Sequence, residues 1–138
     1  MSASTVVVSA LLPVVREAFH GQHGRAGWLA TTIEPASGRS VKLQELFASP
    51  DGIRVLGKAW RSRLPGDVRE CVDDGAFGAY NPNATYFRKF ALTPQGIAIG
   101  VASDSYCGAW YSVVPYGVLR SDLSKIGSRL VGGVRPPQ

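Results

Sequence analysis

The alternation of apolar and small positions predicts a β-hairpin in the second half of the chain. Residues 97–101 alternate with period two, as expected for a strand with one face in a core. Residues 86–92 lead into a turn at 93–96, where proline presets φ and the final glycine tolerates a positive φ. A third strand is predicted at 110–114, and Pro115 ends it because proline has no N–H for the ladder.

Helical spacing predicts an amphipathic helix from 50 to 64, whose apolar residues recur on one face. Ser49 offers a capping hydroxyl, and Pro50 suits the first turn of a helix. A Pro-Gly pair at 65–66 ends this helix. A single helical turn is predicted just before it, at 44–47.

The C-terminal part predicts a second helix followed by a tail. Leu119, Leu123 and Ile126 share one helical face, and Gly127 is placed to end the helix. The tail at 132–138 contains Gly-Gly and Pro-Pro, and we expect it to be flexible.

The N-terminal half reads mainly as strands, predicted at 5–18, 28–33 and 40–43, while residues 67–84 are expected to be irregular. Strands and helices do not alternate singly, which argues against a doubly wound parallel sheet. The predicted fold is α+β, with a largely antiparallel sheet and two main helices packed on one of its faces. We expect one domain over residues 1–131.

Composition adds a basic charge to this picture. The chain has 138 residues, a formal net charge of +5 and 11 arginines among 15 basic residues. Arginine-biased codon usage accounts for such a surplus, and so does a surface that meets polyanions such as nucleic acid, anionic lipid or acidic wall polymers. The longest apolar stretch, at 5–15, is too short to span a bilayer and lacks the basic leading region of a signal peptide.

The two cysteines, Cys71 and Cys107, are 36 positions apart and match no metal-binding or redox motif. In an exported domain we expect them to pair, and the loop-entropy model then gives roughly 4 kcal/mol of stabilisation. In the cytosol they would be two free thiols. Their Gly- and Asp-rich surroundings favour the disulfide.

Three segments in order resemble a known family. They are FHGQHGRAGWLATTIEPASGRSVKLQELF at 19–47, the amphipathic helix at 50–64, and FALTPQGIAIGV at 90–101 with GAWYSVVPYGVL at 108–119. Together they resemble the RsiV-type C-terminal domain, a domain of unknown function in exported bacterial proteins that include anti-sigma factor ectodomains and secreted mycobacterial MPT-type antigens. The resemblance implies an extracytoplasmic or secreted protein. Some members of this family bind lysozyme, but animal-type lysozymes are strongly basic, so the charge of this chain disfavours that partner.

The candidate binding residues are His20, His23, Trp110, Tyr111 and Tyr116. The two histidines stand three residues apart in a glycine-rich loop, a spacing that metal ligands also use. A turn in which His23 bonds to the backbone explains them better, because no third distant ligand is present. Trp110 and Tyr111 are the best candidates for exposed aromatic rings. Tyr116 belongs to the Pro-Tyr segment of the family resemblance.

The sequence contains no nucleophile elbow, zinc-protease helix or phosphate-binding loop. We therefore expect no enzyme activity, no metal and no cofactor, but a non-catalytic extracytoplasmic binding domain for an anionic cell-wall polymer or an envelope protein. One alternative is a wall-associated hydrolase that uses His20 and His23 with Asp73 or Asp74. The other is a cytosolic basic protein that binds nucleic acid, although no nucleic-acid motif supports such a partner.

Overall fold

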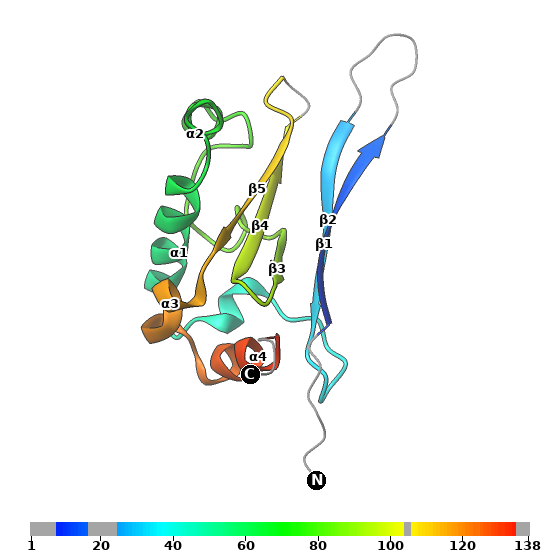
Figure 1. The fold of residues 1–138 in the computed structure, drawn as a ribbon, viewed down its shortest axis with the longest axis vertical. Helices are drawn as coiled ribbons and strands as arrows, with labels where there is room; N and C mark the ends of the chain where they lie inside the picture. The colour runs from blue at the N-terminus through cyan, green and yellow to red at the C-terminus, as the bar shows by residue number, and fades with distance from the viewer. Residues whose placement is uncertain (1–7, 17–24, 104–105, 135–138) are drawn as a thin grey trace.

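A β-hairpin, a three-stranded sheet and a group of helices form three layers in the chain (Figure 1). The computed structural model describes residues 8–16, 25–103 and 106–134. The strands are β1 (Val8–Arg16), β2 (Arg25–Ile33), β3 (Phe90–Leu92), β4 (Ile97–Ala102) and β5 (Ala109–Val114). The helices are α1 (Pro50–Ser62), α2 (Gly66–Asp73), α3 (Tyr116–Leu119) and α4 (Lys125–Val134), with 3-10 turns η1 (Leu43–Leu46) and η2 (Arg120–Asp122).

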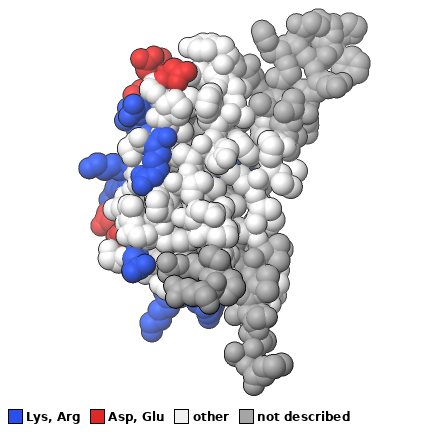
Figure 2. Space-filling view, in the orientation of Figure 1, with Lys and Arg blue, Asp and Glu red and all other residues white. Residues whose placement is uncertain are grey.

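All strand pairs are antiparallel, and they form two units. β1 and β2 pair along their whole length, from Val8 opposite Ile33 to Arg16 opposite Arg25. The sheet has the order β3-β4-β5, so β3 and β5 are its edges. The hairpin stands on one side of the sheet and the helices on the other, which confirms the predicted α+β fold (Figure 1). Figure 2 shows charged side chains along the helix side of one face and none over its middle.

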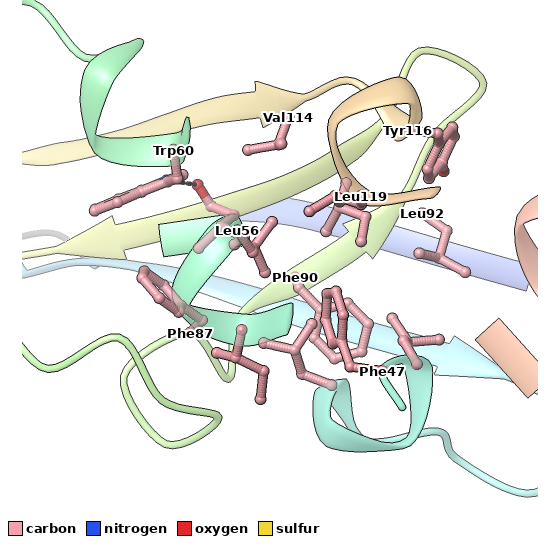
Figure 3. Close-up of a cluster of buried hydrophobic side chains, with 14 of the residues drawn as sticks. Phe47, Leu56, Trp60, Phe87, Phe90, Leu92, Val114, Tyr116 and Leu119 are labelled. Atoms are coloured by element: carbon pink, nitrogen blue, oxygen red, sulfur yellow. Dashed lines mark hydrogen bonds between the residues drawn. The ribbon is translucent and has the colours of Figure 1, made fainter. Parts of the chain in front are cut away.

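Trp60 of α1 joins the helices to the sheet. Its side chain is fully buried, and its indole N–H donates a 3.1 Å hydrogen bond to the carbonyl oxygen of Ile99 in β4. The hydroxyl of Ser112 in β5 donates to the main-chain oxygen of Trp60 at 3.0 Å. Because buried polar groups are costly unless paired, these bonds fix one position of α1 on the sheet. The core around it (Figure 3) includes Phe47, Leu56, Phe87, Phe90, Leu92, Val114 and Leu119.

The first predicted helix is confirmed as α1. Its buried Ile53, Leu56 and Trp60 form the expected apolar face. Ser49 occupies the position before the helix, but its hydroxyl makes no capping hydrogen bond. Pro50 is the first helical residue, where its missing N–H costs nothing.

The predicted third strand at 40–43 is wrong. Only Ser40 forms a bridge, opposite Ile33. The main chain then enters η1, because the Glu45 carboxylate accepts the Lys42 N–H at 2.7 Å and the Glu45 N–H donates back to the Lys42 carbonyl at 3.0 Å. This reciprocal pair stabilises a tight turn and confirms the predicted helical turn as η1.

The region 67–84, predicted to be irregular, begins with α2, whose buried Val68, Cys71 and Val72 recur at helical spacing. Cys71 forms a disulfide with Cys107 in the loop before β5, and their Cα atoms are 6.2 Å apart. The predicted pairing is thus confirmed, although Cys71 lies on a helix rather than in a loop. The bond ties α2 to the start of β5.

The turn at 93–96 forms as predicted, but its glycine is required for another reason. The Thr93 N–H donates to the Gly96 carbonyl at 2.9 Å, and the Thr93 hydroxyl reaches the same oxygen at 2.8 Å. Gly96 does not have a positive φ. Instead, a Cβ at Gly96 would collide with the Val114 carbonyl. The glycine therefore lets the turn approach the end of β5.

The C-terminal helix also differs from the prediction. The chain forms α3 and η2, breaks at Leu123, which bridges to Phe47, and then forms α4. Gly127 lies inside α4, where an added Cβ would collide with the carbonyl of Leu46 in η1. Gly127 thus permits close packing of α4 on η1 instead of ending a helix. α4 continues into the first part of the tail predicted at 132–138.

Tyr86 belongs to an edge-to-face aromatic cluster with Trp60, Tyr80 and Phe87. The ring centroids of Tyr80 and Phe87 each lie 5.2 Å from that of Tyr86. The Tyr86 hydroxyl is buried and has no hydrogen-bond partner among the described residues. Burial, followed by the nearby Tyr80 and Asp73, raises the pKa of Tyr86 to about 12. The cluster therefore holds its phenol in the neutral form.

Gly127→Ala is expected to lower the free energy of unfolding by about 1–3 kcal/mol, because the methyl group must push the η1 backbone away. Gly132→Ala is the matched control, since it lies in the same helix and has open space around its Cβ position. This control should leave stability unchanged or raise it by up to about 1 kcal/mol. Urea denaturation measures both, and equal effects would contradict close packing at Gly127.

Tyr86→Phe is expected to raise the free energy of unfolding by about 1 kcal/mol at pH 7, because it removes an unpaired buried hydroxyl and keeps the ring. The folded-state pKa lies above the ordinary 10.0, so ionisation of this phenol leaves the free energy of unfolding unchanged below pH 10 and lowers it as the pH rises from 10 toward 12. Urea denaturation at pH 7 and pH 11 should show a smaller alkaline loss for the variant. Tyr106→Phe, at a side chain that is 95% exposed, is the control. A less stable Tyr86→Phe at pH 7 would mean that the hydroxyl is paired.

Candidate functional site

The hairpin is fixed to the sheet through Trp28 of β2. Its indole N–H donates a 3.0 Å hydrogen bond to the carbonyl oxygen of Val101 in β4. The ring lies directly on Gly100, where an added Cβ would stand 2.7 Å from it, so a larger residue would displace the indole. Tyr111 of β5 meets Trp28 edge to face, with ring centroids 5.8 Å apart. Trp28 borders a hollow on each side of this contact.

Ser9 makes a second connection, at the other end of the hairpin. Its hydroxyl is 2.7 Å from the Thr32 hydroxyl across the hairpin, and its oxygen accepts the N–H of Leu92 in β3 at 2.7 Å. An edge strand exposes unpaired donors and acceptors. The hairpin therefore covers part of the β3 edge.

Two hollows on the β2 side form what we call the basic cleft. The first, of about 360 Å³, is bordered by Lys42 and Arg88, and the second, of about 260 Å³, by Arg88 and Lys89. No acidic side chain among the described residues lines either hollow. The walls also include apolar residues and these hydroxyl, amide and aromatic side chains: Thr31, Thr32, Ser40, Gln44, Thr85, Trp28, Phe77 and Tyr86.

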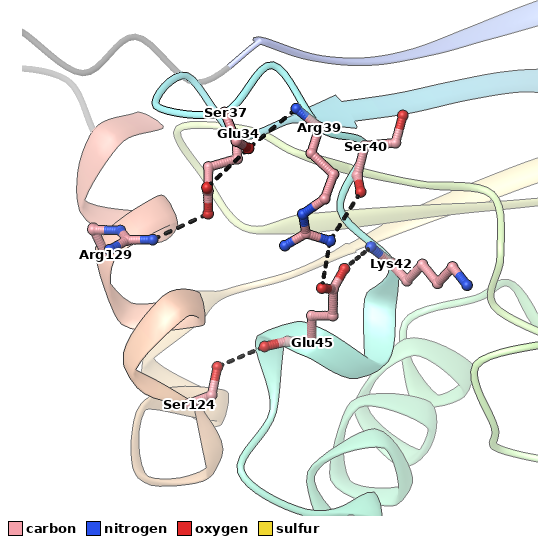
Figure 4. Close-up of polar contacts among 8 residues, drawn as sticks. All are labelled: Glu34, Ser37, Arg39, Ser40, Lys42, Glu45, Ser124 and Arg129. Carbon is pink, nitrogen blue, oxygen red and sulfur yellow. Dashed lines mark hydrogen bonds and ion pairs between the residues drawn. The ribbon is translucent and has the colours of Figure 1, made fainter.

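The carboxylate of Glu45, in η1, does not line the cleft and is bound by other groups. Glu45 accepts the Lys42 N–H and forms a 2.7 Å ion pair with Arg39 (Figure 4). These hydrogen bonds, that of the Lys42 N–H first, lower the pKa of Glu45. No ion pair within the described part of the chain involves Lys42, Arg88 or Lys89. Arg88 donates a 3.1 Å hydrogen bond to the main-chain oxygen of Thr85, which leaves its charge without a counter-ion among the described residues, so the charges of all three residues can attract an anionic ligand.

A third hollow, of about 460 Å³, lies between β1 and the sheet, and we call it the apolar pocket. Its walls include Leu11, Pro13, Trp28, Ala98, Tyr111 and Val113, and no charged side chain lines it within the described chain. The hairpin side of β4 carries the small residues Ala98, Gly100 and Ala102; the Trp28 ring lies on Gly100, and Ala98 lines the pocket. Small residues on this face thus create the pocket.

Trp110 and Tyr111 are both exposed, at 39% and 57%, but they do not form one aromatic surface. Consecutive strand residues point to opposite faces of a sheet. The Trp110 indole donates a 2.6 Å hydrogen bond to the carbonyl of Cys107, whereas Tyr111 turns to the hairpin and lines the apolar pocket. Of these two candidate residues, Tyr111 therefore lines the apolar pocket.

Of the remaining candidate binding residues, the structure describes Tyr116 but not the two histidines. Tyr116 is only 6% exposed, and its hydroxyl donates to the carbonyl oxygen of Thr93. Its ring therefore packs in the core behind the 93–96 turn, and it borders only a small hollow of about 180 Å³. His20 and His23 lie outside the described residues.

The acidic pair considered for catalysis is largely committed to structure. Asp73 accepts two hydrogen bonds from the Arg61 guanidinium, and that hydrogen bonding lowers the pKa of the Asp73 carboxyl. A carboxyl held in its charged form is a poor general acid at neutral pH. Asp74 is exposed at the end of α2. In the ranges that the structure describes, no three His, Cys, Asp or Glu residues are arranged to hold a metal.

Reasoning from the sequence missed the basic cleft. Lys42 follows the bridge at Ser40, while Arg88 and Lys89 precede β3, and only the folded chain brings them to one cleft. The signals in the sequence were the net charge of +5 and the adjacent pair of cations at 88 and 89. Neither indicates where Lys42 lies.

The described helices include none that is both long and apolar enough to cross a membrane. Comparison with known proteins adds no assignment. No protein-family model matches the chain, and no curated protein matches it.

Proposed function

We propose that this chain is a non-catalytic binding module that acts outside the cytoplasm and holds an anionic cell-wall polymer in the basic cleft. One observation carries the proposal: Lys42, Arg88 and Lys89 border adjoining hollows that no described acidic side chain lines. A cleft lined by one sign of charge concentrates ligands of the opposite sign. The net charge of +5 adds long-range attraction for a polyanion.

The walls suit a polymer that carries both charges and sugars or polyols. Arg88 borders both hollows, so a chain of repeating anionic groups can contact Lys42 at one end and Lys89 at the other. Arginine binds phosphate and carboxylate oxygens through several N–H groups at once. Trp28 and Phe77 in the second hollow add aromatic surface for apolar faces of the ligand.

The disulfide supports a place outside the cytoplasm. Disulfides such as Cys71–Cys107 persist in oxidising compartments and are rare in reducing ones. The resemblance to the RsiV-type C-terminal domain agrees with this location. Lysozyme fits less well as a partner, because a basic protein is repelled by a basic chain.

Replacing Lys42, Arg88 and Lys89 by alanine together is expected to weaken binding to a phosphodiester polymer about tenfold or more at low salt, because each exposed charge contributes up to about 1 kcal/mol. Binding is measured by co-sedimentation with cell-wall preparations and by titration with poly(glycerol phosphate). The affinity of the wild type should fall steeply as salt is raised, and the variant should show a shallower salt dependence.

The matched control replaces Lys58, Arg120 and Lys125, which are exposed, border neither hollow and remove the same total charge. If the control loses as much affinity as the cleft variant, net charge alone explains binding and the cleft is not the site. Failure of the wild type to bind either probe at low salt would contradict the proposed ligand. Equal affinity for single-stranded DNA at physiological salt would contradict selection of a wall polymer.

A further inference from the structure

The β5 strand is an edge of the sheet, and its outward backbone groups have no hydrogen-bond partner among the described residues. The Gly100 N–H donates to the Lys89 carbonyl on the β3 side of β4, at 2.9 Å. Backbone groups alternate along a strand, so Val101 turns its own groups toward Trp110, its partner in β5. The next β5 residue, Tyr111, and then Val113 therefore direct their N–H and C=O groups away from the sheet.

This edge lacks the features that usually prevent pairing. Natural edge strands carry lysines, prolines or bulges, or another element covers them. The β5 segment Ala-Trp-Tyr-Ser-Val-Val has neither charge nor proline, and it pairs with β4 without a bulge over all six residues. The opposite edge, β3, is only three residues long, and the Ser9 hydroxyl takes its Leu92 N–H. The two edges of the sheet thus differ in protection.

The apolar pocket borders the same edge. Tyr111 and Val113 are at once the residues with outward backbone groups and part of the wall of this 460 Å³ hollow. In a strand added to β5, every second side chain would lie on the face of Tyr111 and Val113. One such side chain would stand at the mouth of the pocket. Backbone pairing together with side-chain pockets is the mode by which sheet edges bind peptides.

The charges around β5 indicate which kind of ligand would pair with this edge. Neither β5 nor the described lining of the apolar pocket carries a charged side chain, so the part of the ligand that pairs with β5 should be uncharged. Lys and Arg lie together with Asp and Glu along the helix margin of the face shown in Figure 2, and the whole chain has a net charge of +5. Acidic residues beside the pairing segment complement this net charge, while a second copy of the chain would be repelled.

We propose that β5 binds an extended peptide segment of a partner protein as an added strand, with an uncharged centre, one apolar side chain in the apolar pocket and acidic flanks. The site is separate from the basic cleft and does not depend on the proposed polymer.

A library of random nine-residue peptides displayed on phage, selected against the immobilised full chain, tests the proposal. Selected peptides should have uncharged centres with alternating apolar residues and acidic flanks. Val113→Pro removes one outward N–H and blocks the edge while leaving the β4 ladder its donors. It should weaken the selected peptides about tenfold or more. Val118→Lys, at an exposed apolar residue outside β5, is the control and should leave binding unchanged.

A second readout does not depend on any variant folding. In the wild-type chain, the backbone amide resonances of Tyr111 and Val113 should shift on addition of a selected peptide. Absence of enrichment, equal binding to Val113→Pro, or shifts confined to other surfaces would overturn the proposal. So would light scattering that shows a dimer broken by Val113→Pro, since a second copy would then occupy the edge.

Discussion

Two tryptophans hold β4 from its two sides, and the three layers depend on them. Trp60 reaches the carbonyl of Ile99 from the helices, and Trp28 reaches the carbonyl of Val101 from the hairpin. The acceptors are two residues apart on one buried strand. Each indole adds a large apolar surface to a directed hydrogen bond, so it fixes both the distance and the orientation of its layer. Gly100, between the two acceptors, gives Trp28 the room to lie flat.

The hollows follow from this arrangement. The hairpin meets the sheet mainly through Trp28 and the Ser9 hydroxyl, over a face of the sheet built from small residues. Space therefore remains on both sides of Trp28. Lys42, just before η1, and the segment before β3 make one side cationic, whereas β1 and β5 make the other apolar. The same packing that fixes the hairpin thus separates a surface for anions from a surface for an uncharged strand.

Local patterns predict what depends on local sequence. The existence of β4, the apolar face of α1 and the pairing of Cys71 with Cys107 agree with the structure, but β4 is buried on both faces because the hairpin covers the second one. Gly127 shows why other predictions are wrong. A glycine at the end of an apolar pattern predicts the end of a helix, but here the glycine allows close packing against the Leu46 carbonyl of a distant turn. For the same reason the sequence does not predict the basic cleft, because Lys42 and Arg88 border one hollow only after the layers have packed. Tyr116 is the reverse case: the sequence makes it a candidate binding residue, but it is buried in the core.

Hydrogen exchange of the tryptophan indole protons tests the two-sided attachment of β4 most directly. In the wild type, NMR should show protected N–H groups on both Trp28 and Trp60. In Gly100→Ala, the added methyl should push the Trp28 ring away, so its indole proton should exchange much faster while that of Trp60 stays protected. A Trp28 indole that exchanges freely in the wild type, or that is equally protected in Gly100→Ala, would contradict the account.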